Sequence, residues 1–146
     1  MKIALLCMVI AFAVGFGVYQ ATAPAPQKPP QKPEELAQKS AEAWLALVDA
    51  GKYGDSWDEA AAAFKSAASK EQWVEALKKV RAPLGALQSR KLKTATYAKN
   101  PPGAPAAEYV IIQFDTSFEN KNSAVETITP MLEKDGKWRV SGYYIK

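Results

Sequence analysis

Asp115 is the side chain that most resembles a catalytic base, because we interpret it as the one carboxylate in the middle of an expected strand. Proton transfer in an apolar cleft needs such a carboxylate and a facing hydrogen-bond donor, for which Tyr97 and Tyr109 are candidates. The alternative is that Asp115 pairs with Lys91 on a solvated face. We favour the ion pair, because exposed pairs are common and catalytic dyads are rare. No catalytic residue is assigned, and the sequence leans away from an enzyme.

Arg81 and Arg90 are the candidate anion contacts of this chain. The planar fork of a guanidinium group matches a carboxylate or a phosphate. Arginines in such places more often close a helix end or brace a sheet edge, so we favour a structural role while keeping both as candidates.

Missing residue types exclude several kinds of chemistry. The chain has no histidine, and its one cysteine, Cys7, lies in the apolar start. Thiolate catalysis, disulfides and the commonest metal ligands are therefore excluded from the folded part. The glycines form no phosphate loop and the acidic residues have no metal-ligand spacing, so we expect no cofactor and no metal. The lysines are mostly scattered, which argues against nucleic acid as a partner.

Residues 1–23 are interpreted as a signal peptide or an uncleaved membrane anchor. Lys2 precedes an uncharged apolar run that ends at Tyr19, which is typical of an export segment. Ala21-Thr22-Ala23 has the small-x-small pattern of a cleavage site, but Pro24 disfavours cutting there. Residues 24–33 form a proline-rich spacer. We therefore expect an exported protein, either periplasmic or anchored in the inner membrane and facing the periplasm.

Residues 34–146 are expected to form one α+β domain. The spacing of apolar residues predicts helices over 34–50, 56–68 and 70–81, the last begun by the capping-box pattern Ser69-Lys-Glu-Gln72. The expected buried stripe of the first helix consists of Ala37, Ala41, Trp44, Leu45 and Val48, and that of the third of Trp73, Leu77 and Val80. Period-two patterns predict strands over 89–98, 107–118, 124–134 and 137–145, with a two-residue turn at Asp135-Gly136. This order predicts three helices packed on a four-stranded antiparallel sheet.

Hairpin geometry predicts which residues face each other. A turn centred on Gly103 pairs Leu92 with Phe114 and Tyr97 with Tyr109, whereas the Asp-Gly turn pairs Met131 with Val140 and Glu133 with Trp138. In this register the second sheet face has no evident cover and carries many apolar and aromatic residues. It supplies our candidate ligand or partner surface, which consists of Tyr97, Tyr109, Ile111, Met131, Trp138 and Val140.

Three groups of residues together resemble a known family. They are Ala43-Trp44-Leu45 with Val48-Asp49-Ala-Gly51, Ser56-Trp57 and Trp73; Arg81-x-Pro-Leu-Gly85 with Ser89-Arg90; and Asp135-Gly-Lys-Trp138-Arg-Val-x-Gly142-Tyr-Tyr144. In these features the chain resembles the bacterial domain-of-unknown-function family 4019 over roughly residues 33–146. The helix-then-sheet order also resembles the cystatin-like, nuclear-transport-factor-2-like folds. The resemblance implies a bacterial envelope protein and supplies no activity.

Three functions remain open from the sequence. We favour a non-catalytic module that binds a partner protein, a second copy of itself or a small apolar ligand. The first alternative is a ketosteroid-isomerase-like enzyme with a carboxylate in the helix–sheet cleft. The second is a purely structural accessory tethered to the membrane.

Overall fold

The computed structural model describes residues 30–146 of the chain. The expected signal peptide or anchor and residues 24–29 of the spacer lie outside this range. Within it, no helix is both long enough and apolar enough to cross a membrane.

The first helix, α1 (Pro33–Asp49), follows the pattern read from the sequence. Pro33 stands at its first position and Glu34 and Glu35 in its first turn, where a fixed φ and negative charge both favour a helix start. The predicted apolar stripe is confirmed, since the buried residues of α1 are Ala37, Ala41, Trp44, Leu45 and Val48.

The expected helix over residues 56–68 is wrong in its continuity. The structure has two short helices, α2 (Tyr53–Asp58) and α3 (Ala62–Ala67). Ala61 between them is extended, and its N–H donates to the carbonyl of Val140 at 2.8 Å. A tertiary hydrogen bond to the sheet therefore interrupts an alanine-rich run whose local preference is helical.

The fourth helix, α4 (Lys70–Val80), begins at the predicted capping box. The Ser69 hydroxyl accepts from the Gln72 N–H, and the Gln72 side chain accepts from the Ser69 N–H. Trp73 and Leu77 are buried as predicted, but Val80 is 53% exposed. A short 3-10 turn, η1 (Ala82–Leu84), leads into the sheet.

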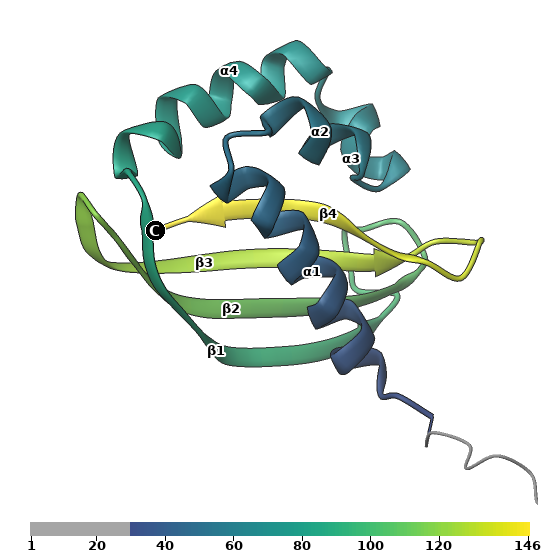
Figure 1. Cartoon of the computed structure of the whole chain (residues 1–146). Helices are drawn as coiled ribbons and strands as arrows, with labels where there is room; N and C mark the ends of the chain where they lie inside the picture. The colour runs from purple at the N-terminus through teal and green to yellow at the C-terminus, as the bar shows by residue number, and fades with distance from the viewer. Residues whose placement is uncertain (1–29) are drawn as a thin grey trace, which may run out of the picture.

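The strands form one antiparallel sheet in the order β1 (Leu87–Lys99), β2 (Glu108–Phe118), β3 (Lys121–Leu132) and β4 (Trp138–Ile145). Strands β1 and β4 are therefore the two edges. Helix α1 crosses one face of the sheet diagonally, and α4 runs along the β4 side (Figure 1). The expected α+β class with helices on an antiparallel sheet is confirmed, and residues 30–146 contain four α-helices where three were predicted.

The register between β1 and β2 agrees with the prediction at one end only. Leu92 lies opposite Phe114 and Lys91 opposite Asp115, as expected. A bulge between Leu92 and Thr94 then shifts the pairing, so that Tyr97 faces Val110 instead of Tyr109. The extra residue moves Tyr97 to the helix side of the sheet.

The turn between β3 and β4 has three residues, not the predicted two. The Glu133 N–H donates to the Lys137 carbonyl, the Gly136 N–H donates to the Glu133 carbonyl, and Gly136 has a φ of 78°. This is the geometry of a three-residue loop that ends in a glycine bulge. Leu132 therefore faces Trp138 and Pro130 faces Val140, which overturns both predicted pairs of this hairpin.

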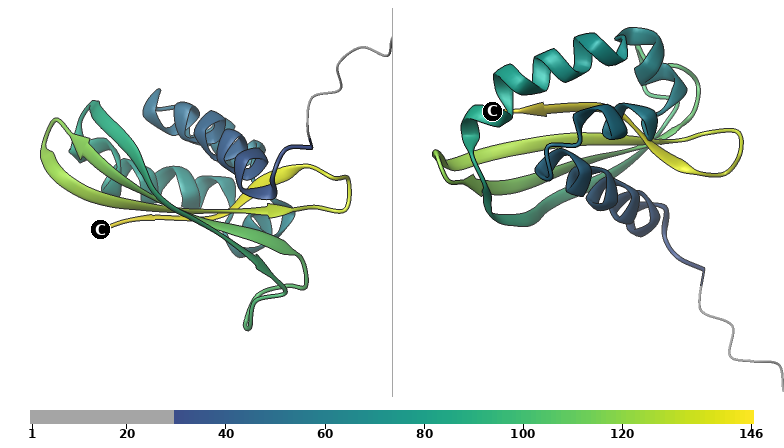
Figure 2. Two further views of the ribbon diagram at one scale, coloured as in Figure 1. Left: turned by 90° about the horizontal axis from the view of Figure 1, so that it is seen from below. Right: turned by 45° about the horizontal axis from the view of Figure 1, so that its top comes forward.

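The core lies between the helices and the face of the sheet that they cover. Trp44, Phe64, Trp73 and Tyr143 form its aromatic centre, with ring centroids 4.8–6.5 Å apart. Figure 2 shows the strong twist of the sheet beneath α1. A second, small cluster joins Ala61 to Tyr109 and Met131 on the opposite face. The start of α3 therefore covers part of the face that the sequence left without a cover.

Candidate functional site

Glu126 is a carboxylate in the middle of β3 and is fully buried, with 0% of its surface exposed. It lies on the helix-covered face, two residues before Ile128. Its oxygens accept four hydrogen bonds: 2.6 Å and 3.1 Å from Arg90 Nε and Nη2, 2.7 Å from Thr116 and 2.5 Å from the Tyr143 hydroxyl. Burial of a charge is tolerated only with such partners.

Asp49 extends this network to the end of α1. It accepts from Arg90 Nη1 and Nη2 at 2.7 Å and 3.0 Å, and from Arg81 Nη2 at 3.1 Å. Arg81 stacks over the ring of Phe118 and donates to the Gly85 carbonyl at 2.7 Å. We call Asp49, Arg81, Arg90, Thr116, Glu126 and Tyr143 the buried network. It joins the ends of two helices to all four strands.

Electrostatics fix the protonation of two network residues. Burial, reinforced by the charge of Glu126 and the hydrogen bond to it, raises the pKa of the Tyr143 hydroxyl. Burial alone would lower the pKa of Arg90, but hydrogen bonds to Asp49 and Glu126 outweigh it and raise that pKa. At neutral pH Tyr143 is therefore a donor and Arg90 a cation.

The expectation that Asp115 is the one carboxylate in mid-strand is wrong, because Glu126 is another. Asp115 is exposed on the face away from α1, and it pairs with Lys93 at 3.0 Å while facing Lys91 in the register. Asp115 therefore forms an exposed ion pair with a lysine of β1, as predicted, but the lysine is Lys93 and not Lys91. The isomerase-like version that uses Asp115 is overturned, because this carboxylate lies in solvent and not in the helix–sheet cleft.

The alternation of side chains along β3 is a sequence signal that places Glu126 on the covered face. Counting back by two from Ile128 places Glu126 on the same face of the strand, and Thr116 lies on the same face of β2 as Ile112 and Phe114. The structure brings Arg81 and Arg90 together on Asp49, and their anion is a side chain of the chain itself.

The six residues of the candidate partner surface do not share one face. Tyr109, Ile111 and Met131 lie on the face away from α1, whereas Tyr97, Trp138 and Val140 lie on the helix-covered side. Tyr109, Met131 and Val140 are buried. The middle of the opposite face is instead polar, with Gln113 beside Thr127 and Asp115 beside Val125. The bulge after Leu92 moved Tyr97 to the helix side, and the three-residue turn moved Trp138 and Val140 there, so the predicted surface is divided between the two faces.

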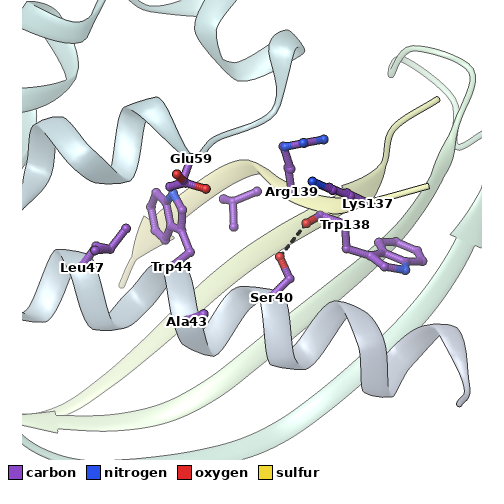
Figure 3. A pocket seen from close by; sticks show the side chains of 9 residues that line it. Ser40, Ala43, Trp44, Leu47, Glu59, Lys137, Trp138 and Arg139 are labelled. Atoms are coloured by element: carbon purple, nitrogen blue, oxygen red, sulfur yellow. Dashed lines mark hydrogen bonds between the residues drawn. The ribbon is translucent and has the colours of Figure 1, made fainter. Parts of the chain in front are cut away.

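A first groove lies between α1 and the first half of β4 and has a volume of about 230 Å³. Ser40 donates to the carbonyl of Trp138 at 2.6 Å across its floor, and Glu59, Lys137 and Arg139 stand at its rim (Figure 3). Arg139 is already paired with Glu133 and Asp135. The volume is below the ~300–1,000 Å³ of small-molecule sites.

A second groove, the α4–β4 groove, lies between α4 and the second half of β4. Its volume is about 310 Å³, and its lining is mainly apolar: Trp73, Ala76, Leu77, Val80, Tyr143, Tyr144 and Ile145. Val80 on α4 is 53% exposed beside this groove. Tyr144, which also lines the groove, is 52% exposed and lies opposite Thr127 in the register. The sequence alone does not indicate this groove, because the apolar spacing of the helix predicts a buried Val80.

Metal binding has no geometric support in this part of the chain. Among residues 30–146, no three side chains of His, Cys, Asp or Glu gather where they would hold a metal ion.

The fold and its surfaces define a small α+β domain whose helices cover one face of a four-stranded antiparallel sheet. The profile of a protein family of unknown function, DUF4019, matches residues 40–143. The chain therefore belongs to this family, as its tryptophan, arginine and glycine positions suggested. No curated protein matches the sequence significantly.

Proposed function

We propose that this protein is a non-catalytic interaction module of the bacterial envelope, which binds a protein partner at the α4–β4 groove. The single observation that carries the proposal is a contrast in exposure. Large apolar side chains are exposed around this groove, whereas the chemically capable groups of the interior are enclosed. Apolar surface that a fold leaves open next to a groove is typical of a binding site.

The state of Glu126 supports a non-catalytic role. Arg90, Thr116 and Tyr143 occupy its oxygens, and none of the grooves along β4 is lined by Glu126. A general base needs a free lone pair within reach of a substrate proton. The aromatic side chains of Trp44, Trp73 and Tyr143 fill the region where an isomerase-like cleft would open.

The sequence supports the envelope location. Lys2 with the apolar run up to Tyr19 is typical of an export segment, and the prolines of residues 24–33 suit an extended tether. Such a tether would hold the domain away from the membrane surface with its grooves accessible.

Photocrosslinking in cells tests the proposal. A photoreactive amino acid replaces Ala76, which is exposed in the α4–β4 groove, and the matched control carries it at Ala46, which is exposed on α1. We expect a discrete crosslinked protein at position 76 that is absent at position 46 and is lost in a Val80→Glu background. Identical products at both positions, or none at position 76, would contradict a binding role for this groove.

A further inference from the structure

The second half of β4 presents unpaired backbone groups beside the α4–β4 groove. Val125 and Lys146 exchange two backbone hydrogen bonds of 3.0 Å each. Because bonded pairs alternate in an antiparallel ladder, Tyr144 also bonds inward, and Tyr143 and Ile145 direct their N–H and C=O groups outward. Within residues 30–146, these outward groups have no hydrogen bond to another element.

The first half of the same edge is closed. Ser40 on α1 donates to the Trp138 carbonyl, and the Ala61 N–H donates to the Val140 carbonyl. The opposite edge of the sheet, β1, carries Lys91, Lys93 and Lys99, and charges of this kind discourage strand addition. The open part of the sheet is thus the few residues that follow Val140 on β4.

From these observations we propose that the α4–β4 groove accepts an extended peptide segment of a partner protein, which adds as a fifth strand to β4. The inference rests on the proposed function and specifies its binding mode. Only an extended backbone supplies donors and acceptors at the spacing that Tyr143 and Ile145 present. Alternate side chains of the segment would contact Ala76 and Val80 on α4.

Charge defines a second property of the segment. Lys78 and Lys79 lie in the last turn of α4, and Lys146 follows β4. Lys78 pairs with Glu75 at 2.9 Å, whereas Lys79 and Lys146 have no ion pair within residues 30–146. The complementary segment therefore has apolar residues at alternate positions and an acidic residue at the end that meets these lysines.

The position of α4 favours a separate segment over a second copy of this chain. Helix α4 projects past β4 at the edge of the sheet, as Figure 1 and the right view of Figure 2 both show. Two copies whose β4 strands paired antiparallel would be related by a twofold axis perpendicular to the sheet. Both α4 helices would then enter the same space above the joint, whereas a single strand fits below one helix.

The probe is a peptide selected from a phage-displayed library of random linear peptides. The target of the selection is the full-length chain in detergent. We expect enriched sequences with alternating apolar residues and an acidic end. The best synthetic peptide should slow hydrogen exchange at the amides of Tyr143 and Ile145. Ala76→Lys should weaken its binding at least about tenfold by filling the groove, and Ala46→Lys, the same change on α1, should leave binding unchanged.

Two variants at one position isolate the backbone contribution. Ile145→Pro removes the outward N–H, and proline is tolerated on an edge strand where that N–H faces solvent. Ile145→Ala shortens the side chain but keeps the N–H. We expect the proline variant to bind the peptide about five- to tenfold more weakly than the alanine variant, the effect of one lost hydrogen bond.

The possible failures are distinguishable. Peptides that need Ala76 but leave the two amides unprotected would overturn strand addition and keep the groove as a binding site. The absence of any enriched peptide together with a positive crosslink at position 76 would do the same. If the two amides become protected as the protein concentration rises, with no peptide present, the strand that adds to β4 is a second copy of this chain and not a partner peptide. Failure of both experiments would reject the proposed function as well.

Discussion

The buried network and the β4 edge differ in whether their polar groups have hydrogen-bond partners within the protein. Glu126 has four hydrogen bonds in a site with no exposure, whereas the outward backbone groups of Tyr143 and Ile145 have none to another element of the described chain. Tyr143 belongs to both regions, since its hydroxyl enters the network and its backbone lines the edge. The difference separates what holds the fold from what is available to a partner.

Solvent explains why both arrangements are stable. A buried charge without partners costs several kcal/mol, and each charged side chain of the network has a partner of opposite charge. Within residues 30–146, Arg81 Nε is buried without a hydrogen bond. An edge amide in water keeps its hydrogen bonds to solvent and exchanges them at little cost when a strand arrives. Changes to the network should therefore affect stability, and changes to the edge should affect binding.

The largest effect should come from Glu126→Ala. Removal of this carboxylate leaves Arg90 buried with Asp49 as its only remaining anion, so we expect a loss of about 3–5 kcal/mol in the free energy of unfolding. Urea denaturation checks the value. Asp115→Ala on the exposed face is the control and should cost less than about 1 kcal/mol. Equal effects of the two changes would show that burial does not distinguish them.

Replacing both Arg90 and Glu126 tests whether the network stabilises the fold through the pairing of its charges. Arg90→Met and Glu126→Leu should each destabilise the fold, and the double variant should be more stable than either single variant, since no unpaired charge remains between them. A double-mutant cycle in urea measures this coupling. Strictly additive effects would contradict a direct interaction.

Tyr143→Phe should cost about 1.5–3 kcal/mol through the lost bond to a charged acceptor. It should also change the response to alkali. Because the folded pKa of Tyr143 lies above its unfolded value of about 10, the native state retains a proton that the unfolded state loses. Stability from this group is complete below that pH and falls as the pH rises above it. The decline between pH 10 and 11 should be steeper in the wild type than in Tyr143→Phe, because all other tyrosines are common to both.

The smallest effect on stability should come from the exposed side of the α4–β4 groove. Val80→Ser changes a side chain that is 53% exposed, and we expect less than about 0.5 kcal/mol. Leu77→Ser, one turn earlier on α4 and buried, is the matched control and should cost about 2–5 kcal/mol. If Val80→Ser were as damaging as Leu77→Ser, the groove would be part of the core.

Elements with a strong local pattern were predictable. The Ser69–Gln72 capping box and the stripe from Ala37 to Val48 depend on neighbours in sequence, and both were confirmed. The register was predictable only in part. The bulge after Leu92 shifts the β1–β2 pairing by one residue, and the three-residue turn shifts the β3–β4 pairing by one up to Pro130. A shift of one residue moves each affected side chain to the other face of the sheet. The predicted partner surface depended on that register and was divided with it.

The sequence by itself determined the α+β class, the starts of α1 and α4 and the family, because each depends on local spacing or on recurring residues. The export segment stays a prediction. Tertiary structure alone decided the rest. It broke the alanine-rich helix at Ala61, paired Arg81 and Arg90 with Asp49, and left β4 open next to α4. These features join residues distant in the chain, and only the packed fold sets which polar groups find partners and which remain exposed.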